Sequence, residues 1–243
     1  MTEEIKNIVV IPLYKLKSSS VHSGHRLDNV YEIYKEMTEL SISSIKKNLV
    51  GYDEIMVLEG ELVDTEDMFR DIFYRIYELW KTKKYNILCS YSDVLFMKQT
   101  EIFGKFADFM LFTTAVAHNT LHHLGHPAYL DGLKYYPSTM DEEIFKLADK
   151  KWKEAGINYK KWAFELDVHN IMFFTQKKGI YKTQYTLYPE LFYQMVEPSS
   201  YGYSHQPIVN QGKITDAKVL HFHSTRGVHD VLNKMKIYSK QNL

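Results

Sequence analysis

Two different spacings of apolar residues follow one another over the first 90 positions of the chain. Three short runs rich in β-branched and aliphatic residues, at 7–14, 53–60 and 85–90, have the length and composition of buried strands. Between them, residues 27–47 and 64–81 carry apolar side chains at the three- and four-residue spacing of an amphipathic helix. The order strand, helix, strand, helix, strand predicts a parallel sheet with helices on its faces.

The pattern is less regular beyond residue 90, and the stretch 185–196 shows no clear period. The other elements that we predict there are a short helix at 98–106, strands at 108–113, 128–137 and 218–224, and helices at 139–155, 162–176 and 227–238. The strand at 128–137 is interrupted by Asp131-Gly132. No repeat or low-complexity linker divides the chain, which predicts a single domain.

Composition makes this an ordinary globular chain of 243 residues, with 45% hydrophobic and 25% charged side chains. Its formal net charge is zero, but residues 1–133 carry 14 basic and 19 acidic side chains, whereas residues 134–243 carry 16 and 11. A basic second half suits an anionic partner such as a nucleotide or a nucleic acid backbone. A solvated lysine-rich helix face is the alternative for any single cluster.

The single cysteine and the absence of long apolar runs indicate the cellular compartment in which we expect the protein. Cys89 lies within an apolar run, so we expect a small buried hydrophobic residue and a reducing environment. The first residues lack the pattern of a signal peptide, and no apolar run has the length of a membrane span. We therefore expect a soluble cytoplasmic protein.

Asp93 is the first candidate for chemistry, because it directly follows the predicted buried strand at 85–90. Open α/β sheets bind ligands at the carboxyl ends of their strands. A carboxylate there can hold a divalent cation, and the cation can hold a diphosphate. The alternative is that Asp93 caps the short helix predicted after it.

His221 and His223 alternate with Phe222 on the last predicted strand, so their side chains point to the same side. Either imidazole can serve the same cation as Asp93, and Arg226 can meet a phosphate as a bidentate donor. The alternative is that the two histidines bind no cation and are either packed in the protein or exposed to solvent.

Two further groups of polar residues are candidates for a functional site. Glu165 and Asp167 begin an apolar helix, where they can act as a general base or position a sugar hydroxyl, or can simply match the helix dipole. The histidine cluster at 118–126 has a zinc-like spacing if it is helical, but Gly125 and Pro127 favour a loop.

Several of these segments together resemble nucleotide-sugar-dependent glycosyltransferases of the GT-A fold, in which a strand runs into an Asp-x-Asp motif. Residues 86–96, Asn-Ile-Leu-Cys-Ser-Tyr-Ser-Asp-Val-Leu-Phe, match that motif in a degenerate form. Tyr91 stands at the position of the first Asp and Asp93 at that of the second.

Three later segments resemble further elements of the family, in the same order along the chain. Residues 130–137 resemble its Asn-x-Gly turn, with Leu130 in place of Asn. Residues 164–170 resemble its acidic-Gln element, with Leu166 where Gln is usual. Residues 218–223 resemble its C-terminal strand, which supplies a metal-ligating histidine.

This resemblance implies a GT-A type α/β fold, with a Rossmann-like, mixed but mostly parallel central sheet flanked by helices. The single domain would comprise a nucleotide-binding half, 1–112, and an acceptor-binding half, 113–243. The implied co-substrate is a nucleoside-diphosphate sugar, foremost a UDP-sugar. The implied cofactor is a divalent cation, Mn²⁺ or Mg²⁺, held by Asp93 and by His221 or His223.

The resemblance also implies roles for the remaining candidates. The residues expected to bind the nucleotide are Pro12, Tyr14, Arg26, Tyr91, Ser92 and Asp93. Those expected to act in catalysis are Asp131, Glu165 and Asp167, which would face the donor sugar and acceptor, and Arg226, which would stabilise the leaving diphosphate. In an inverting enzyme Glu165 or Asp167 would be the base, and in a retaining enzyme both would position the substrate.

A narrower resemblance concerns residues 8–14 and 22–31, which are similar to phage glycosyltransferases that modify hydroxymethylcytosine in DNA or a sugar already on that base. Aromatic residues able to stack on a base are Trp152, Trp162, Tyr201 and Tyr203. A glycan or protein acceptor is an alternative. So is a non-catalytic nucleic-acid-binding protein, although zero net charge counts against it. A nucleotidyltransferase would need a glycine-rich basic signature after the first strand, which is missing.

Overall fold

A computed structural model describes residues 4–16, 30–62, 65–114, 130–143, 145–146, 149–150, 193–196, 217–222 and 228–240. The strands of the main sheet are β1 (Lys6–Leu16), β3 (Glu54–Leu62), β4 (Tyr85–Ser90), β7 (Met110–Thr114) and β8 (Leu130–Tyr136). Shorter strands are β2 (Leu49–Val50), β5 (Val94–Phe96), β6 (Thr100–Glu101), β9 (Tyr193–Val196) and β10 (Val219–Phe222). The helices are α1 (Val30–Asn48), α2 (Thr65–Lys81) and α5 (Val228–Lys240). None of these described helices is long and apolar enough to cross a membrane.

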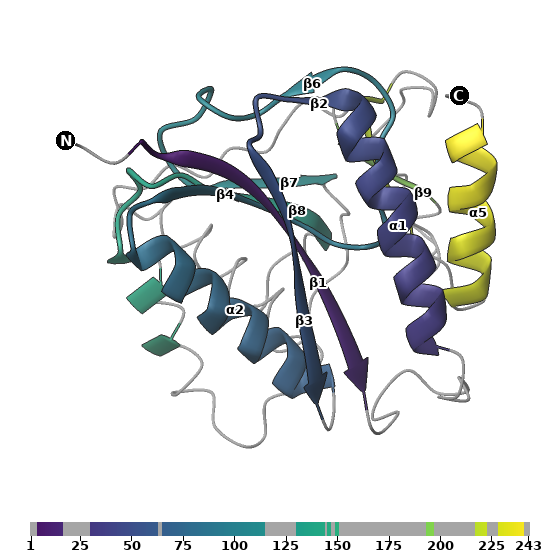
Figure 1. The fold of residues 1–243 in the computed structure, drawn as a ribbon, viewed down its shortest axis with the longest axis horizontal. Coiled ribbons are helices and arrows are strands. Elements are labelled where there is room, and N and C mark those ends of the chain that lie inside the picture. Colours follow the sequence, from purple (N-terminus) through teal and green to yellow (C-terminus); the bar gives the residue numbers. More distant parts are fainter. Residues whose placement is uncertain are drawn as a thin grey trace, which may run out of the picture.

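The central sheet has the strand order β3-β1-β4-β8-β7 (Figure 1). β1 is parallel to β3 and to β4, which confirms the parallel arrangement predicted from the first 90 residues. β8 runs antiparallel to both of its neighbours, so the sheet is mixed. The three parallel strands end at the same edge, which is where a sheet of this type presents its ligand-binding residues.

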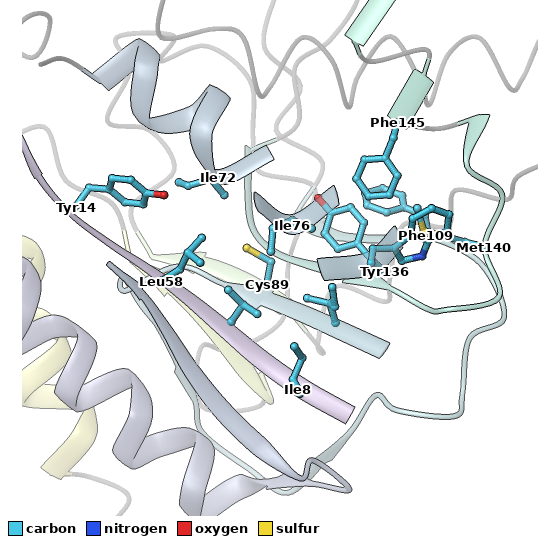
Figure 2. Packing of buried hydrophobic residues seen from close by; sticks show 13 residues of the cluster. Ile8, Tyr14, Leu58, Ile72, Ile76, Cys89, Phe109, Tyr136, Met140 and Phe145 are labelled. Carbon is cyan, nitrogen blue, oxygen red and sulfur yellow. The ribbon is translucent and has the colours of Figure 1, made fainter. Parts of the chain in front are cut away.

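Helix α2 covers one face of this sheet with a narrow apolar stripe. Ile72, Ile76 and Trp80 follow one another at four-residue intervals and are all buried. They pack against side chains of β1 and β4, including Ile8 and Cys89 (Figure 2). The indole Nε1 of Trp80 donates a hydrogen bond of 2.8 Å to the carbonyl of Pro137, so the one polar atom of this ring is satisfied in the core. The burial of Cys89 confirms the expectation from the sequence.

The opposite face is covered by a second, small sheet with strand order β5-β10-β9. Successive side chains of the small sheet point to opposite sides. On one side, Val94 and Val219 pack in a cluster with Leu88 of the central sheet. Leu95 and Leu220, one residue further along each strand, belong to a separate cluster with α1 and α5. The small sheet therefore packs on the central sheet with one side and on α1 and α5 with the other. α1 also contacts the central sheet directly, since Ile45 packs with Val9 and Ile11 of β1. The helices α1 and α5 run side by side (Figure 1).

One local prediction was wrong. Residues 98–106 do not form a helix: Thr100 and Glu101 pair with β2 as the strand β6, and Gly104 follows in a turn with φ of +77°. The first strand, predicted at 7–14, spans Lys6–Leu16 and continues through Pro12. Because β1 pairs with β4 only up to Val10, a residue without an amide hydrogen is tolerated beyond that point.

The interruption predicted at Asp131-Gly132 is a bulge within a continuous strand. The register of β7 with β8 shifts between Phe112 and Thr113, which face Leu133 and Asp131 respectively. Gly132 is thus the extra residue on β8. Its carbonyl accepts a hydrogen bond from the Tyr91 amide, directly after the end of β4. The predicted helix at 162–176 and the histidine cluster at 118–126 lie outside the described residues.

Candidate functional site

The turn between β4 and β5 carries Asp93 and is held from three sides by backbone hydrogen bonds. The Tyr91 amide donates to the Gly132 carbonyl of β8 at 2.9 Å, and the Val94 amide closes the turn onto the Tyr91 carbonyl at 3.3 Å. The Phe222 amide of β10 donates to the Asp93 carbonyl at 2.8 Å. The position of the Asp93 carboxylate is therefore defined by both sheets.

Helix α1 fixes the far end of β5. The Phe96 amide donates to the Ser44 hydroxyl at 3.0 Å, and the Asn48 side-chain amide donates to the Phe96 carbonyl at 2.5 Å. Both backbone groups of one residue are thus bonded to polar side chains of a helix, and the strand that follows Asp93 is tied to α1.

Asp93 and His221 meet at this turn. The Nε2 atom of His221 lies 3.3 Å from Oδ2 of Asp93, and the two side chains are 8% and 29% exposed. The other carboxylate oxygen, Oδ1, is buried and has no hydrogen-bond partner among the described residues. The turn leads into β5 rather than into a helix, which removes the alternative that Asp93 is a helix cap.

The Asp93–His221 pair has the donor set and spacing of two neighbouring ligands of a divalent cation. Ligand atoms bound side by side at about 2.1 Å in octahedral geometry lie about 3.0 Å apart, close to the observed separation. The described residues contain no group of three or more His, Cys, Asp or Glu side chains arranged around one point. A cation here would take its remaining ligands from phosphate oxygens and water, as Mg²⁺ and Mn²⁺ commonly do.

Tyr34 of α1 is a neighbour of Asp93 that the sequence did not single out. The residue as a whole is 37% exposed, yet burial of the phenol, together with the negative charge of Asp93, raises the pKa of Tyr34 to about 12. Nothing in the local sequence links this position to residue 93.

Tyr91 is paired with a buried lysine, which sequence reasoning also missed. Lys134 of β8 is 2% exposed, and its Nζ donates to the Tyr91 hydroxyl at 3.1 Å and lies 4.8 Å from the centre of the ring. Lys134 faces Cys89 in the register of β8 with β4, so it projects to the α2 side of the sheet. The available signal was a lysine within a strand whose other large residues are buried.

The predicted nucleotide-binding residues of β1 lie at the same edge of the sheet but within the core. Tyr14 is 5% exposed, and its hydroxyl donates to Asp71 of α2 at 2.5 Å and accepts from Arg75 at 3.2 Å. Burial, followed by the bond to Asp71, raises the pKa of Tyr14 well above its ordinary value. These contacts tie β1 to α2. Pro12 and Ser92 are buried as well.

The other predicted site residues are described in part or not at all. The backbone of Asp131 is part of β8, directly before the bulge at Gly132. The residues that lie outside the described ranges are Arg26, Glu165, Asp167, His223 and Arg226. The structure thus brings His221 of one predicted segment to Tyr91 and Asp93 of another, and it adds Lys134 and Tyr34 as neighbours.

Comparison with known proteins gives a match at the level of structure. The sequence matches no model of a known protein family and no curated protein. Among solved structures, the chain is similar to a glycosyltransferase involved in the glycosylation of the major capsid of PBCV-1, with a TM-score of 0.56 and 12% identity. The similarity covers 96% of this chain and 99% of that one. The chain therefore has a glycosyltransferase fold of the GT-A-like α/β type.

Proposed function

We propose that this protein transfers a sugar from a nucleoside-diphosphate sugar, foremost a UDP-sugar, to an acceptor hydroxyl. The observation that carries the proposal is the Asp93–His221 pair, with its 3.3 Å separation, directly after β4 of the central sheet. That edge is where α/β sheets bind nucleotides, and the GT-A-like fold supports the same reaction class.

The role of Asp93 and His221 would be to hold a divalent cation, Mn²⁺ or Mg²⁺. When bound, the cation neutralises the charge that develops on the diphosphate leaving group. His223 and Arg226 follow His221 closely in the sequence, and we assign them to the same diphosphate. The buried oxygen of Asp93 supports this role, because a carboxylate atom without a hydrogen-bond partner among the described residues is suited to a metal ion.

For the sugar and the acceptor we retain the assignments that the sequence resemblance implies. Asp131, Glu165 and Asp167 would face the donor sugar and the acceptor hydroxyl. The proposed acceptor is hydroxymethylcytosine in DNA, or a sugar already on that base, and the more basic second half of the chain suits it. The structural neighbour takes part in the glycosylation of a capsid, so a protein-linked acceptor is the competing proposal.

The donor half of the proposal is tested by donor turnover. The protein is incubated with a panel of UDP-, GDP- and TDP-sugars, once with MnCl₂ and once with EDTA, and the released nucleoside diphosphate is measured. We expect release from one donor class, increased by Mn²⁺. Absence of release from every donor, by a protein with a cooperative thermal transition, would rule out the proposed reaction.

The acceptor half needs a separate assay with the donor found in the first. DNA containing hydroxymethylcytosine is compared with the same sequence containing cytosine, and the mass of the digested nucleosides is measured. We expect one added sugar mass on the hydroxymethylated base only. If the donor is turned over but the DNA stays unmodified, the proposal of a glycosyltransferase stands and this acceptor is excluded. DNA binding without any donor turnover would favour the non-catalytic alternative.

A further inference from the structure

The side chain of Tyr34 lies at the proposed site, but the proposed function gives it no role. The residue as a whole is 37% exposed, so it is not enclosed in the core. Apart from the hydrogen bonds of the helix backbone, its carbonyl accepts from the Thr38 hydroxyl at 2.8 Å, and its own hydroxyl has no hydrogen-bond partner in the described part of the chain. A hydroxyl that lies within a protein without such a partner is commonly one that a ligand or an ion completes.

The packing of α1 explains why Tyr34 lies next to Asp93. The last turns of α1 bond to Phe96, the residue at the far end of β5. Ile33, the residue before Tyr34, packs in one cluster with Leu95 in the middle of that strand. Helix and strand therefore run in opposite directions, and the first turns of the helix lie toward the end of β5 that Asp93 precedes. Tyr34 is close enough for the charge of Asp93 to act on its phenol.

Tyr34 and Asp93 are a hydrogen-bond donor and an acceptor that lie near each other without a bond between them. Oδ1 of Asp93 is buried and has no hydrogen-bond partner among the described residues, and the Asp93 side chain as a whole is 29% exposed. The Tyr34 phenol keeps its proton at neutral pH, because its pKa is raised to about 12. The pair is therefore suited to bind two groups of one ligand complex, with a cation on the carboxylate and an anionic oxygen on the hydroxyl.

We propose that Tyr34 is a donor-binding residue, whose hydroxyl donates a hydrogen bond to a phosphate oxygen of the nucleoside diphosphate on the cation held by Asp93 and His221. This inference rests on the proposed function. A neutral donor is suited to this position, because a positive side chain would repel the cation and a negative one would repel the phosphate. The hydroxyl also leaves the charge of Asp93 available to the cation, since it does not bond to that carboxylate.

Isothermal titration calorimetry with nucleoside diphosphates tests this contact directly. UDP, GDP and TDP are titrated at a limiting and at a saturating concentration of MnCl₂, and we expect the unmodified protein to bind one of them. Tyr34→Phe keeps the ring and removes the hydroxyl. It should weaken binding of that nucleotide by about 10- to 100-fold, the range for loss of a hydrogen bond to a charged group, and by the same factor at both concentrations.

Asp93→Asn provides the comparison, because it weakens the cation site instead. Its affinity for the nucleotide should be low at the limiting MnCl₂ concentration. At the saturating concentration the affinity should recover at least in part, since excess Mn²⁺ compensates for weaker cation binding. A hydroxyl that contacts the phosphate itself gives no such recovery in Tyr34→Phe.

Two controls separate nucleotide binding from a structural role. The Tyr77 hydroxyl donates to Glu142 at 2.7 Å, and Tyr77 lies in α2 on the other face of the central sheet. Tyr77→Phe should therefore leave the affinity unchanged at both MnCl₂ concentrations. The melting temperature of Tyr34→Phe without nucleotide should equal that of the unmodified protein or exceed it, because the lost hydroxyl has no partner among the described residues.

Equal affinities of Tyr34→Phe and the unmodified protein would overturn the inference and leave the proposed function intact. Recovery of Tyr34→Phe at saturating MnCl₂ would overturn it too, because the hydroxyl would then act through the cation and not on the phosphate. A Tyr34→Phe protein that melts lower and binds the nucleotide less tightly would show a structural role only. If the unmodified protein binds none of these nucleotides at either MnCl₂ concentration, the inference falls together with the proposed function.

Discussion

Asp93 holds its position because its own backbone and that of Tyr91 are bonded to two different strands. The carbonyl of Asp93 accepts from β10, and the amide of Tyr91 donates to β8. The carboxylate itself needs none of these bonds, since one oxygen faces His221 and the other has no hydrogen-bond partner among the described residues. At the scale of the residue, backbone hydrogen bonds hold Asp93 in place, and its carboxylate contributes little to the stability of the protein.

This separation of stability from function gives the first prediction. Asp93→Asn should lower Mn²⁺-stimulated transfer by at least about 100-fold, because it removes a negative ligand at the leaving group. The melting temperature should change by less than about 2 °C, because the carboxylate forms no bond that the fold depends on. The matched control is Asp108→Asn, which lies before β7 at the opposite edge of the sheet and should retain full activity. Full activity of Asp93→Asn would show that Asp93 only shapes the turn.

Tyr34 provides the second prediction, on pH. Its pKa is raised to about 12 in the folded protein and is about 10 in the unfolded chain, so folding favours the neutral phenol. The stability that this provides is fully present below pH 10 and is lost as the pH rises from 10 toward 12. Tyr34→Phe should therefore show a smaller loss of unfolding free energy over that interval. Urea unfolding between pH 8 and pH 11.5 measures this loss. If the unfolding free energy falls equally steeply with pH in the unmodified protein and in Tyr34→Phe, the raised pKa of Tyr34 is contradicted.

At the scale of elements, β1, β3 and α2 are joined at one point around Tyr14. Its hydroxyl bonds to Asp71 of α2, and Arg75 of the same helix bonds to that hydroxyl and to the Glu59 carbonyl of β3 at 2.7 Å. The ring of Tyr14 lies against Gly60 so closely that a Cβ at that position would be 2.2 Å from Cε1. The carboxyl ends of β1 and β3 are thus held together beside the proposed donor site.

The third prediction follows from that close approach. Gly60→Ala should lower the free energy of unfolding by about 1–3 kcal/mol, because the new methyl group forces the Tyr14 ring or the strand to shift. In a Tyr14→Val background, which lacks the atoms that would collide, the same substitution should cost much less. Urea unfolding of the four proteins of this cycle gives the coupling energy. Additive effects would show that the ring moves aside at no cost.

At the scale of the whole molecule, two layers of the described chain meet at the turn after β4. Tyr91 packs against the cluster that α2 forms with the central sheet, and Asp93 contacts His221 of the small sheet. A ligand bound at this turn would therefore lie next to both layers. Its binding should therefore stabilise the molecule as a unit.

The fourth prediction measures that stabilisation. A nucleoside diphosphate with Mn²⁺, at 100 times its dissociation constant, contributes about 2.7 kcal/mol to the folded state. For a chain of this size, this corresponds to a rise in melting temperature of about 5–10 °C. Differential scanning fluorimetry should show the rise with one nucleotide of the panel, and Asp93→Asn should reduce it. An unchanged melting temperature with every nucleotide, each with and without Mn²⁺, would contradict the proposed site.

The sequence by itself determined the elements that depend on local periodicity. The bounds of β4 are those predicted, and β1, β3, α1 and α2 lie within a few residues of the prediction, because the apolar spacing of each decides which face it buries. It also determined the parallel order of β3, β1 and β4, because strands connected through helices pair in parallel. Asp93 and His221 were candidates for the same reason: each follows or belongs to a strand with a clear pattern.

Only the tertiary structure decided which of these residues meet. Asp93 and His221 are 128 positions apart, and their contact depends on the pairing of the predicted strand β10 with β5, a strand of three residues that was not predicted. The pairing of β6 with β2 likewise replaced the predicted helix at 98–106. Lys134 meets Tyr91 across 43 positions because β8 pairs antiparallel with β4 up to Ser90, the residue before Tyr91. Contacts of this kind arise from strand register and layer packing, which no local pattern of residues encodes.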